Sequence, residues 1–395
     1  MRQHSMISSF EGARGVAALL VALYHFNLFL PFGLAFPAFI SYGYLFVDLF
    51  FVLSGYVICS TYENRLDNGN DFVTFAIRRF GRLFPLLIFS TAAFILIPDA
   101  FILVKHVLVA FGHQGMFQSP GALAYYLPTG VELVATLTMT HGLGLFDKAI
   151  LNYASWSIST EFYTYLVFAG ACLLLKGRAR LAIFMVLSVA GFVVTCWASL
   201  IVHHCVAQLE CLNITFDFGL ARCIGSYFLG CLTFYAARFY ASRHARLYEA
   251  RWQTCALLVV GSLFALVARA PMLAFLFPLA FALLILSLAP DRGFAAQALK
   301  TKAAQMLGQR SYSLYLMHPA LLQLFGHSTG HISGIGKGLA ILALYTVTLI
   351  VISGLTYRFI EQPFRDMFNR WAQKQGNVRA NRSVLTPVPE RASRD

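Results

Sequence analysis

Charged residues are scarce in this chain of 395 residues, and their scarcity excludes most classes of protein. Asp, Glu, Lys and Arg make up 12% of the sequence, whereas 58% is hydrophobic and the mean hydropathy is +0.68. A water-soluble domain could not bury that much apolar surface. The composition therefore predicts an all-α, polytopic integral membrane protein.

Several motifs of soluble chemistry are also missing. The eight cysteines contain no C-x-x-C pair, and there is no phosphate-binding glycine-rich loop. Ser54-Gly55 lacks the surroundings of a nucleophile elbow, so small-residue helix packing is expected there. The histidines have no carboxylate or cysteine partners at ligand spacing, so no metal is expected. Cys205 and Cys211 differ from the other cysteines, because they share a predicted outer loop where a disulfide could form.

The apolar runs predict about ten transmembrane helices, at 13–31, 43–61, 83–104, 155–175, 180–202, 219–238, 253–270, 272–289, 309–328 and 338–360. With the N-terminus inside, the inner segments hold 24 of the 30 lysines and arginines, and the outer segments hold four. This asymmetry predicts that both termini are cytoplasmic. The net charge of +13 then reflects the same asymmetry and a basic tail, so no nucleic-acid partner is expected.

The segments between and beyond these helices carry further expectations. The first apolar segment has no small-residue cleavage pattern and contains Arg14, so it should remain as a transmembrane helix. The long outer loop 105–154 is expected to include an interfacial or re-entrant helix at 122–141. Residues 372–395 are polar and basic and are expected to form a disordered cytoplasmic tail. We find no inverted repeat of the transporter type.

Two ionisable residues, Arg14 and His25, lie within the first hydrophobic segment. Such residues are costly in a membrane helix and usually mark function. Their eleven-residue spacing is about three helical turns, so both side chains fall on one face, about 16 Å apart along the axis. That distance is roughly half a bilayer. A cation near one membrane surface and an imidazole near mid-membrane suit a reaction in which a substrate enters from one side of the membrane.

Four titratable residues on four predicted helices lie at a similar depth. His25, Asp48 and Glu161 fall slightly to the outer side of their helix midpoints, and His318 falls near the centre of its own. Charges at this depth are tolerated when they are paired or line a wet cavity. Convergence into one polar site is the economical interpretation. Separate hydrogen bonds between helices are the alternative.

A second basic group, Arg78-Arg79-Phe80-Gly81-Arg82, directly precedes the third predicted helix at the inner surface. Guanidinium groups suit phosphates, so with Arg14 they could bind a phosphorylated cytosolic ligand. The alternative is an anchor that binds the head groups of membrane lipids.

Six stretches resemble elements of the membrane-bound acyltransferase family 3, the bacterial O-acyltransferases of surface sugars. They occur in the family's order from about residue 8 to 365. They are the R-x10-H spacing of Arg14 and His25, the run from Asp48 to Tyr56, the run from Arg78 to Pro85, Trp156-Ser-Ile-Ser-Thr-Glu161, Ser311-Tyr-Ser-Leu-Tyr-Leu-Met-His318 and Glu361-Gln-Pro363.

The resemblance implies an acyltransferase domain over 1–371 in the bacterial inner membrane. The donor would be acyl-CoA, most often acetyl-CoA, and the acceptor a carbohydrate hydroxyl on a polysaccharide or lipid-linked glycan. Arg14, Arg78, Arg79 and Arg82 would bind the CoA phosphates. The acceptor could instead be a macrolide-type natural product, and nothing in the sequence fixes the oligomeric state.

The resemblance also implies catalytic roles. His25 would act as a general base or become acylated. Asp48 or Glu161 would orient its ring, and His318 would polarise the thioester carbonyl or line the acceptor path. Two other classes remain open from the residues themselves, a transporter or flippase for a lipid-linked glycan and a non-catalytic scaffold.

Overall fold

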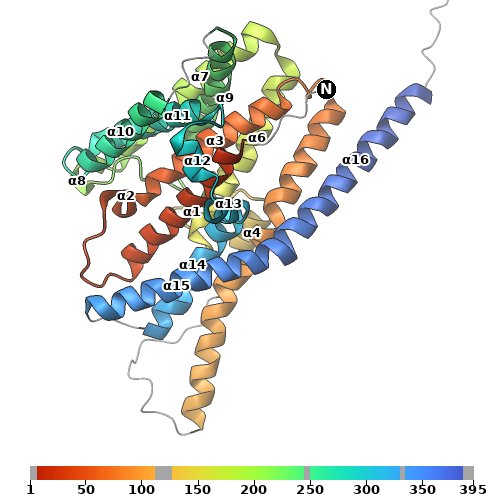
Figure 1. The fold of residues 1–395 in the computed structure, drawn as a ribbon. Helices are drawn as coiled ribbons and strands as arrows, with labels where there is room; N and C mark the ends of the chain where they lie inside the picture. The colour runs from red at the N-terminus through yellow and green to blue at the C-terminus, as the bar shows by residue number, and fades with distance from the viewer. Residues whose placement is uncertain (1–6, 112–126, 244–249, 330–333, 386–395) are drawn as a thin grey trace, which may run out of the picture.

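The computed structural model describes residues 7–111, 127–243, 250–329 and 334–385, and this part of the chain contains helices and no strand (Figure 1). The elements are α1 Ser8–Phe29, α2 Ala38–Ser41, η1 Gly43–Leu45, α3 Phe46–Tyr62, α4 Gly69–Ala110, α5 Gly130–Leu137, η3 Tyr153–Ser155, α6 Trp156–Leu174, α7 Gly177–Trp197, η4 Ala198–Val202, α8 Cys205–Gln208, α9 Gly219–Arg243, α10 Ala250–Val267, η5 Pro271–Leu276, α11 Phe277–Leu288, α12 Phe294–Leu299, α13 Lys302–Gln309, α14 Ser311–Thr329, α15 Ile335–Thr356, η6 Tyr357–Glu361 and α16 Gln362–Leu385.

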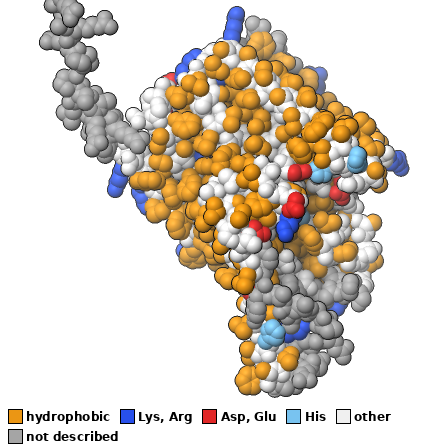
Figure 2. Space-filling view, turned by 180° about the vertical axis from the view of Figure 1, so that it is seen from behind, with side chains coloured by type: hydrophobic (Ala, Val, Ile, Leu, Met, Phe, Trp, Pro, Cys, Tyr) orange, Lys and Arg blue, Asp and Glu red, His pale blue; other side chains and the backbone are white. Residues whose placement is uncertain are grey.

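Eight helices in the described residues are long and apolar enough to cross a membrane. They are Ser8–Phe29, Gly43–Tyr62, Gly69–Ala110, Tyr153–Leu174, Gly177–Val202, Gly219–Tyr240, Pro271–Leu288 and Ile335–Gln375. The two other predicted helices, at 253–270 and 309–328, correspond to α10, whose apolar stretch is shorter, and α14. Figure 2 shows hydrophobic side chains spread over most of one face, as contact with lipid requires. The prediction of an all-α, multi-pass membrane protein is confirmed.

The third predicted helix, at 83–104, is longer in the structure. α4 has 42 residues and begins at a capping box, in which the side chains of Asn68 and Asp71 bond each other's backbone. Arg78, Arg79 and Arg82 therefore lie within the helix and not in a segment before it. α4 also takes in residues 105–110 of the predicted outer loop. Of the segment 122–141, where a helix is expected, Gly130–Leu137 forms α5. Residues 112–126 lie outside the described residues.

The C-terminal helices form a nearly continuous rod. α16 follows α15 through η6, packs against α4 and projects away from the other helices (Figure 1). At the crossing, a Cβ on Gly81 would lie 2.1 Å from the Cβ of Phe368, so only glycine allows this approach. The tail expected to be disordered begins within α16, which continues to Leu385; residues 386–395 lie outside the described residues.

Two glycines bring α3 and α9 into backbone contact. A Cβ on Gly55 would lie 1.9 Å from the carbonyl oxygen of Tyr227, and a Cβ on Gly230 would lie 2.0 Å from that of Val52. Small residues commonly allow membrane helices to approach this closely. The interpretation of Ser54-Gly55 as a packing element is thus confirmed for Gly55. The same crossing places Asp48 on α3 within hydrogen-bond distance of side chains on α9.

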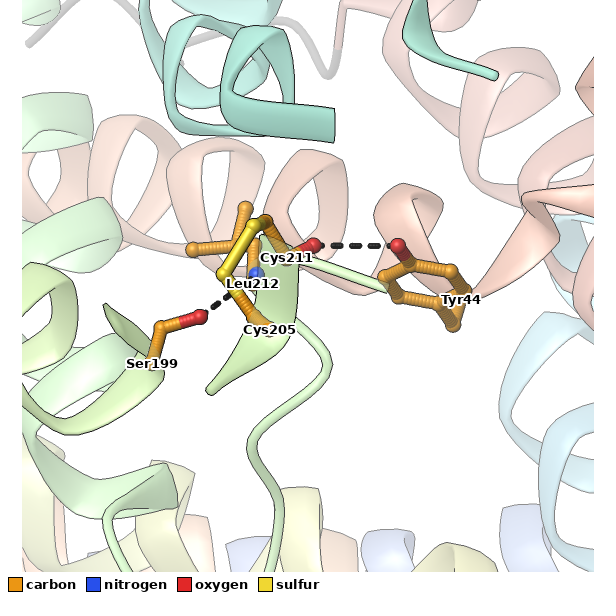
Figure 3. Close-up of a disulfide and its surroundings, with 5 residues drawn as sticks. All are labelled: Tyr44, Ser199, Cys205, Cys211 and Leu212. Carbon is orange, nitrogen blue, oxygen red and sulfur yellow. Dashed lines mark hydrogen bonds between the residues drawn. A yellow bond between two sulfur atoms is a disulfide. The ribbon is translucent and has the colours of Figure 1, made fainter. Parts of the chain in front are cut away.

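Cys205 and Cys211 form a disulfide in the loop that joins α7 to α9 (Figure 3). The hydroxyl of Tyr44 donates to the carbonyl oxygen of Cys211 at 3.0 Å, and the backbone N–H of Leu212 donates to Ser199 Oγ at 3.0 Å. These contacts tie the disulfide loop to η1, just before α3, and to η4, which follows α7. The disulfide that the sequence allows is therefore present.

Candidate active site

The position of α14 beside α1 depends on close backbone packing. A Cβ on Gly12 would lie 2.0 Å from the carbonyl oxygen of Leu299, and a Cβ on Gly15 would lie 2.3 Å from the backbone nitrogen of Gly308. α1 therefore lies directly against α12 and α13, and it also contacts α14, which begins two residues after α13 ends. This packing sets the register in which α1 and α14 present their histidines.

His25 on α1 and His318 on α14 meet, with ring centroids 4.8 Å apart. The Nδ1–H of His25 donates to the carbonyl oxygen of Val21 at 2.9 Å, and that of His318 to the carbonyl oxygen of Tyr315 at 2.5 Å. Because a carbonyl only accepts, each neutral imidazole carries its proton on Nδ1 and leaves a lone pair on Nε2. Nε2 of His318 is buried and has no hydrogen-bond partner in the described part of the chain. We name these two residues the histidine pair.

Two cavities are lined by residues that neighbour the histidine pair, although neither histidine is itself a lining residue. The first, the Arg14-side cavity, has a volume of about 40 Å³ and is lined by Arg14, Val47, Phe50, Phe51, Ser157, Ile158, Glu161, Ser311, Tyr312 and Tyr315. The second, the Tyr153-side cavity, has a volume of about 270 Å³ and is lined by Phe29, Leu30, Tyr153, Pro319, Leu322, Gln323 and Gly326.

The order of residues along three helices puts the histidine pair between these cavities. On α1, Arg14 borders one cavity, Phe29 borders the other, and His25 lies between them. On α14, the lining residues before His318 belong to the Arg14-side cavity and those after it to the Tyr153-side cavity. In the η3–α6 segment the order is reversed. Tyr153 borders the Tyr153-side cavity, and residues after it, up to Glu161, border the Arg14-side cavity. Groups entering from opposite sides would therefore meet at the histidines.

Arg14 on α1 and Glu161 on α6 line the same cavity. Within the described residues, the Arg14 guanidinium makes no hydrogen bond or ion pair. Glu161 accepts a hydrogen bond from the Tyr165 hydroxyl at 2.6 Å. The hydroxyl oxygen of Tyr165 is in turn 2.8 Å from Ser54 Oγ. An unpaired, half-buried cation beside a cavity within a membrane helix is costly unless it binds something there. Arg14 is therefore available to an anionic ligand.

The arginines of α4 have different surroundings. Arg79 lies over the rings of Tyr62, Phe75 and Tyr165, 5.4 to 5.7 Å from their centroids. Arg82 forms an ion pair with the buried Glu361 at 3.0 Å, and Glu361 also accepts from Ser313 Oγ. Nε of Arg78 and of Arg79 is buried without a hydrogen-bond partner.

Asp48 does not reach the histidine pair. Its carboxylate is fully buried and accepts two hydrogen bonds from Arg222, at 2.7 and 3.1 Å, and one from Ser226 Oγ at 2.7 Å. The expectation that Asp48 or Glu161 orients the His25 ring is not met in this structure, because the Nδ1–H of His25 is occupied by the Val21 carbonyl. Asp48 instead joins α3 to α9.

Two residues at or near this site were not singled out from the sequence. Arg222 is buried, and besides Asp48 it donates to the carbonyl oxygens of Tyr44 and Ile214. The signal was a lone arginine inside a predicted membrane helix, which requires a buried partner. Tyr153 contacts both histidines from a short turn, and no sequence signal identified it.

Comparisons with known proteins agree with a membrane acyltransferase. A family model described as an acyltransferase domain, that of acyltransferase family 3, matches residues 7–358. The chain is 25% identical, over 92% of its length, to YrhL of Bacillus subtilis (strain 168), whose name assigns it provisionally as a peptidoglycan O-acetyltransferase. It is 33% identical, over 43% of its length, to 92% of a Rhizobium radiobacter protein named protein 2 in the picA locus.

A Staphylococcus aureus (strain COL) protein, named provisionally as an O-acetyltransferase, is 34% identical over 26% of the chain and 17% of its own length. The chain spans 56% of the length of YrhL. No solved structure matches the chain. Because the family model covers nearly all of the chain, the chain belongs to acyltransferase family 3 and is a multi-pass membrane O-acyltransferase.

Proposed function

We propose that the chain moves an acyl group, most simply acetyl, from cytosolic acyl-CoA to a hydroxyl of a carbohydrate. The observation that carries this proposal is the histidine pair between two cavities, one of which contains the unpaired Arg14. The carbohydrate would be a cell-surface polysaccharide or a lipid-linked glycan at the bacterial inner membrane. The names of YrhL and the Staphylococcus aureus relative support an O-acetyl product.

The donor would enter from the Arg14 side. Arg14 has no protein partner in the described residues, and the arginines of α4, Arg78, Arg79 and Arg82, lie on a helix that also packs against α14. Guanidinium groups bind phosphates through paired N–H donors. The pantetheine arm is long enough to span the roughly 16 Å from Arg14 to His25. The nucleotide would then stay at the cytosolic surface while the thioester reaches the histidine pair.

The chemistry would use Nε2 of His25. In direct transfer, the acceptor oxygen attacks the thioester carbonyl carbon while Nε2 takes the hydroxyl proton, the C–S bond breaks, and the proton passes to the departing thiolate. In the covalent route, Nε2 itself attacks the carbonyl carbon, the C–S bond breaks and the CoA thiolate leaves; the acceptor oxygen then attacks the acyl carbon and the bond to Nε2 breaks. In this second route His318, which also has a free lone pair at Nε2, would take the proton of the acceptor hydroxyl, because Nε2 of His25 is then acylated.

The acceptor would enter through the Tyr153-side cavity. This cavity is the larger of the two, and the rings of Phe29 and Tyr153 form part of its wall. Aromatic rings offer apolar faces suited to packing against a sugar ring. A hydroxyl placed in this cavity would approach the histidines from the side opposite to the donor.

The experiment that tests the proposal is CoA release by the purified protein. The protein would be placed in lipid nanodiscs with acetyl-CoA, with longer acyl-CoA donors in parallel, and free thiol and intact-protein mass would be followed. We expect release of CoA, with either a slow hydrolytic turnover or an acylated protein. A folded protein that neither binds nor cleaves any acyl-CoA would favour transport of a lipid-linked glycan.

Replacing Arg14 with alanine is expected to raise the KM for acetyl-CoA by about tenfold or more, because a hydrogen bond to a charged group contributes about 1.5–3 kcal/mol. The kcat should fall far less, since Arg14 does not contact the histidine pair. Arg178→Ala is the matched control, because Arg178 is exposed at the start of α7. A KM unchanged by Arg14→Ala would mean that Arg14 has a structural role and does not bind the donor.

Orientation in the membrane can be tested with single cysteines. Lys148 and Arg178 are both exposed and lie on opposite predicted sides. In a Cys255→Ser background, which removes the exposed native thiol, we expect a membrane-impermeant maleimide to label Lys148→Cys in intact cells. Arg178→Cys should be labelled only after permeabilisation. The reverse pattern would invert the proposed topology and place the Arg14 side outside the cytoplasm.

A further inference from the structure

Acyl transfer at the histidine pair requires a hydrogen-bond donor that the two imidazoles do not supply. Both Nδ1–H groups are bonded to backbone carbonyls, so each Nε2 presents a lone pair. When a thioester carbonyl is attacked, negative charge develops on its oxygen. Two lone pairs would repel that charge. The donor must therefore come from a third residue near the pair.

Tyr153 is in contact with both histidines. Its ring centroid lies 5.2 Å from that of His25 and 6.2 Å from that of His318, and it packs at 5.4 Å from Phe29. Its hydroxyl is buried and has no hydrogen-bond partner among the residues that the structure describes. The ring also lines the Tyr153-side cavity. An unpartnered buried hydroxyl is unusual because its desolvation is not compensated, and at a functional site it indicates a missing ligand.

The other tyrosine rings in contact with the pair each reach one histidine: the ring centroid of Tyr24 lies 4.8 Å from that of His25, and Tyr315 contacts His318. Tyr315, whose ring is 5.7 Å from that of His318, donates to the carbonyl oxygen of Ala154 and is 2.8 Å from Ser157 Oγ. Tyr312 donates to the carbonyl oxygen of Leu83. Tyr153 is thus the hydroxyl-bearing residue that contacts both imidazoles and remains without a partner in the described part of the chain.

The turn that carries Tyr153 is held from several directions. The side-chain amide of the fully buried Asn152 donates to the carbonyl oxygen of Leu316 at 3.0 Å and to Ser90 Oγ at 3.3 Å. Its Oδ1 accepts from the backbone N–H of Ala154 at 3.3 Å. Leu151 has a φ of 53°, in the left-handed region that a leucine rarely adopts. Such strain persists where the surrounding structure fixes the backbone, and it is concentrated at functional sites.

We propose that the Tyr153 hydroxyl donates a hydrogen bond to the acyl carbonyl oxygen as negative charge forms on it. The role rests on the proposed acyl-CoA chemistry and is the same in the direct and covalent routes. The nucleophile, the acceptor hydroxyl or His25 Nε2, adds to the carbonyl carbon, and the oxygen gains the charge. The electron pair on the oxygen then re-forms the carbonyl double bond as the C–S bond breaks and the thiolate leaves. Tyr153 keeps its proton throughout, so no further reactant is needed.

The test is Tyr153→Phe, which removes the hydroxyl and leaves the ring. Loss of one oxyanion donor lowers kcat by about 10²–10³-fold in other acyl-transfer enzymes, and we expect a fall of that order. The KM for acetyl-CoA should change less than twofold, because the bond forms chiefly in the transition state. Tyr227→Phe is the matched control: its hydroxyl is also buried and unpartnered, but it lies on α9 and lines neither cavity. It should retain wild-type kcat.

A second variant separates the hydroxyl's chemistry from its packing. Incorporation of 3,5-difluorotyrosine at position 153 keeps the donor but makes the phenol more acidic. Because a phenolate cannot donate, we expect near-wild-type kcat at low pH and a descending limb of kcat at lower pH than in the wild type. This readout would also serve if Tyr153→Phe folded poorly.

The outcomes are distinct. Wild-type kcat in Tyr153→Phe, or a pH profile unmoved by fluorination, would overturn the role of Tyr153 while the acyl-CoA reaction stands. A folded wild-type protein that cleaves no acyl-CoA would overturn the proposed function and this role with it.

Discussion

Replacing His25 with alanine is expected to abolish acyl transfer or to lower it by at least about 10²-fold, and as much as 10⁴-fold for loss of a general base. If the route is covalent, any acylated form of the protein should disappear as well. The physical reason is that Nε2 presents a free lone pair within the histidine pair, because Nδ1–H is held by the Val21 carbonyl. The measurement is the rate of CoA release, with intact-protein mass in parallel.

The control for His25→Ala is His204→Asn. His204 is exposed in the loop before α8 and has a φ of 48°, which asparagine tolerates, so this change should leave turnover and stability unchanged. Size-exclusion profiles and thermal unfolding should be similar for all three proteins. Turnover by His25→Ala within a few-fold of the wild type would mean that His25 is not the base or nucleophile.

Replacing Asp48 with asparagine is expected to destabilise the folded protein by about 3–5 kcal/mol, because it leaves Arg222 as an uncompensated buried charge. Arg222 is 1% exposed and Asp48 is fully buried, so water cannot replace the lost partner. The measurement is thermal unfolding of the purified protein, together with the yield of folded material. Turnover per folded molecule should stay close to that of the wild type, since Asp48 does not contact His25.

A double variant sharpens this prediction. In Asp48→Asn with Arg222→Gln the unpaired charge is gone, so part of the lost stability should return, as expected for two residues in one network. If Asp48→Asn were instead as stable as the wild type but inactive, Asp48 would act in the chemical step and our structural interpretation would be wrong.

The sequence predicted the membrane helices well where apolar length is the only requirement. α1 and α3 begin five and three residues from the starts of the predicted helices. α4 was predicted too short because its first four turns carry Asp71, Arg78, Arg79 and Arg82, which interrupt the apolar run. The capping box of Asn68 and Asp71 was the available signal for its true start.

The site could be predicted only in part. Depth along a helix follows from residue number, so the common level of His25 and His318 could be inferred, and the structure brings them together. The direction in which a side chain points around the helix depends on which helices are neighbours. Asp48 shares the predicted level but faces Arg222, 174 residues away in sequence. Tyr153 lies in a turn whose path is set by Asn152 and α14, which no local pattern records.

The central claim is that a donor entering from the Arg14 side meets the acceptor at the histidine pair. The side of the membrane from which acetyl-CoA is used tests this claim most directly. The measurement is CoA release from acetyl-CoA added to sealed inside-out and right-side-out membrane vesicles, with His25→Ala vesicles as the background. We predict His25-dependent release by inside-out vesicles, and by right-side-out vesicles only after permeabilisation. Equal release by intact vesicles of both orientations would contradict the account.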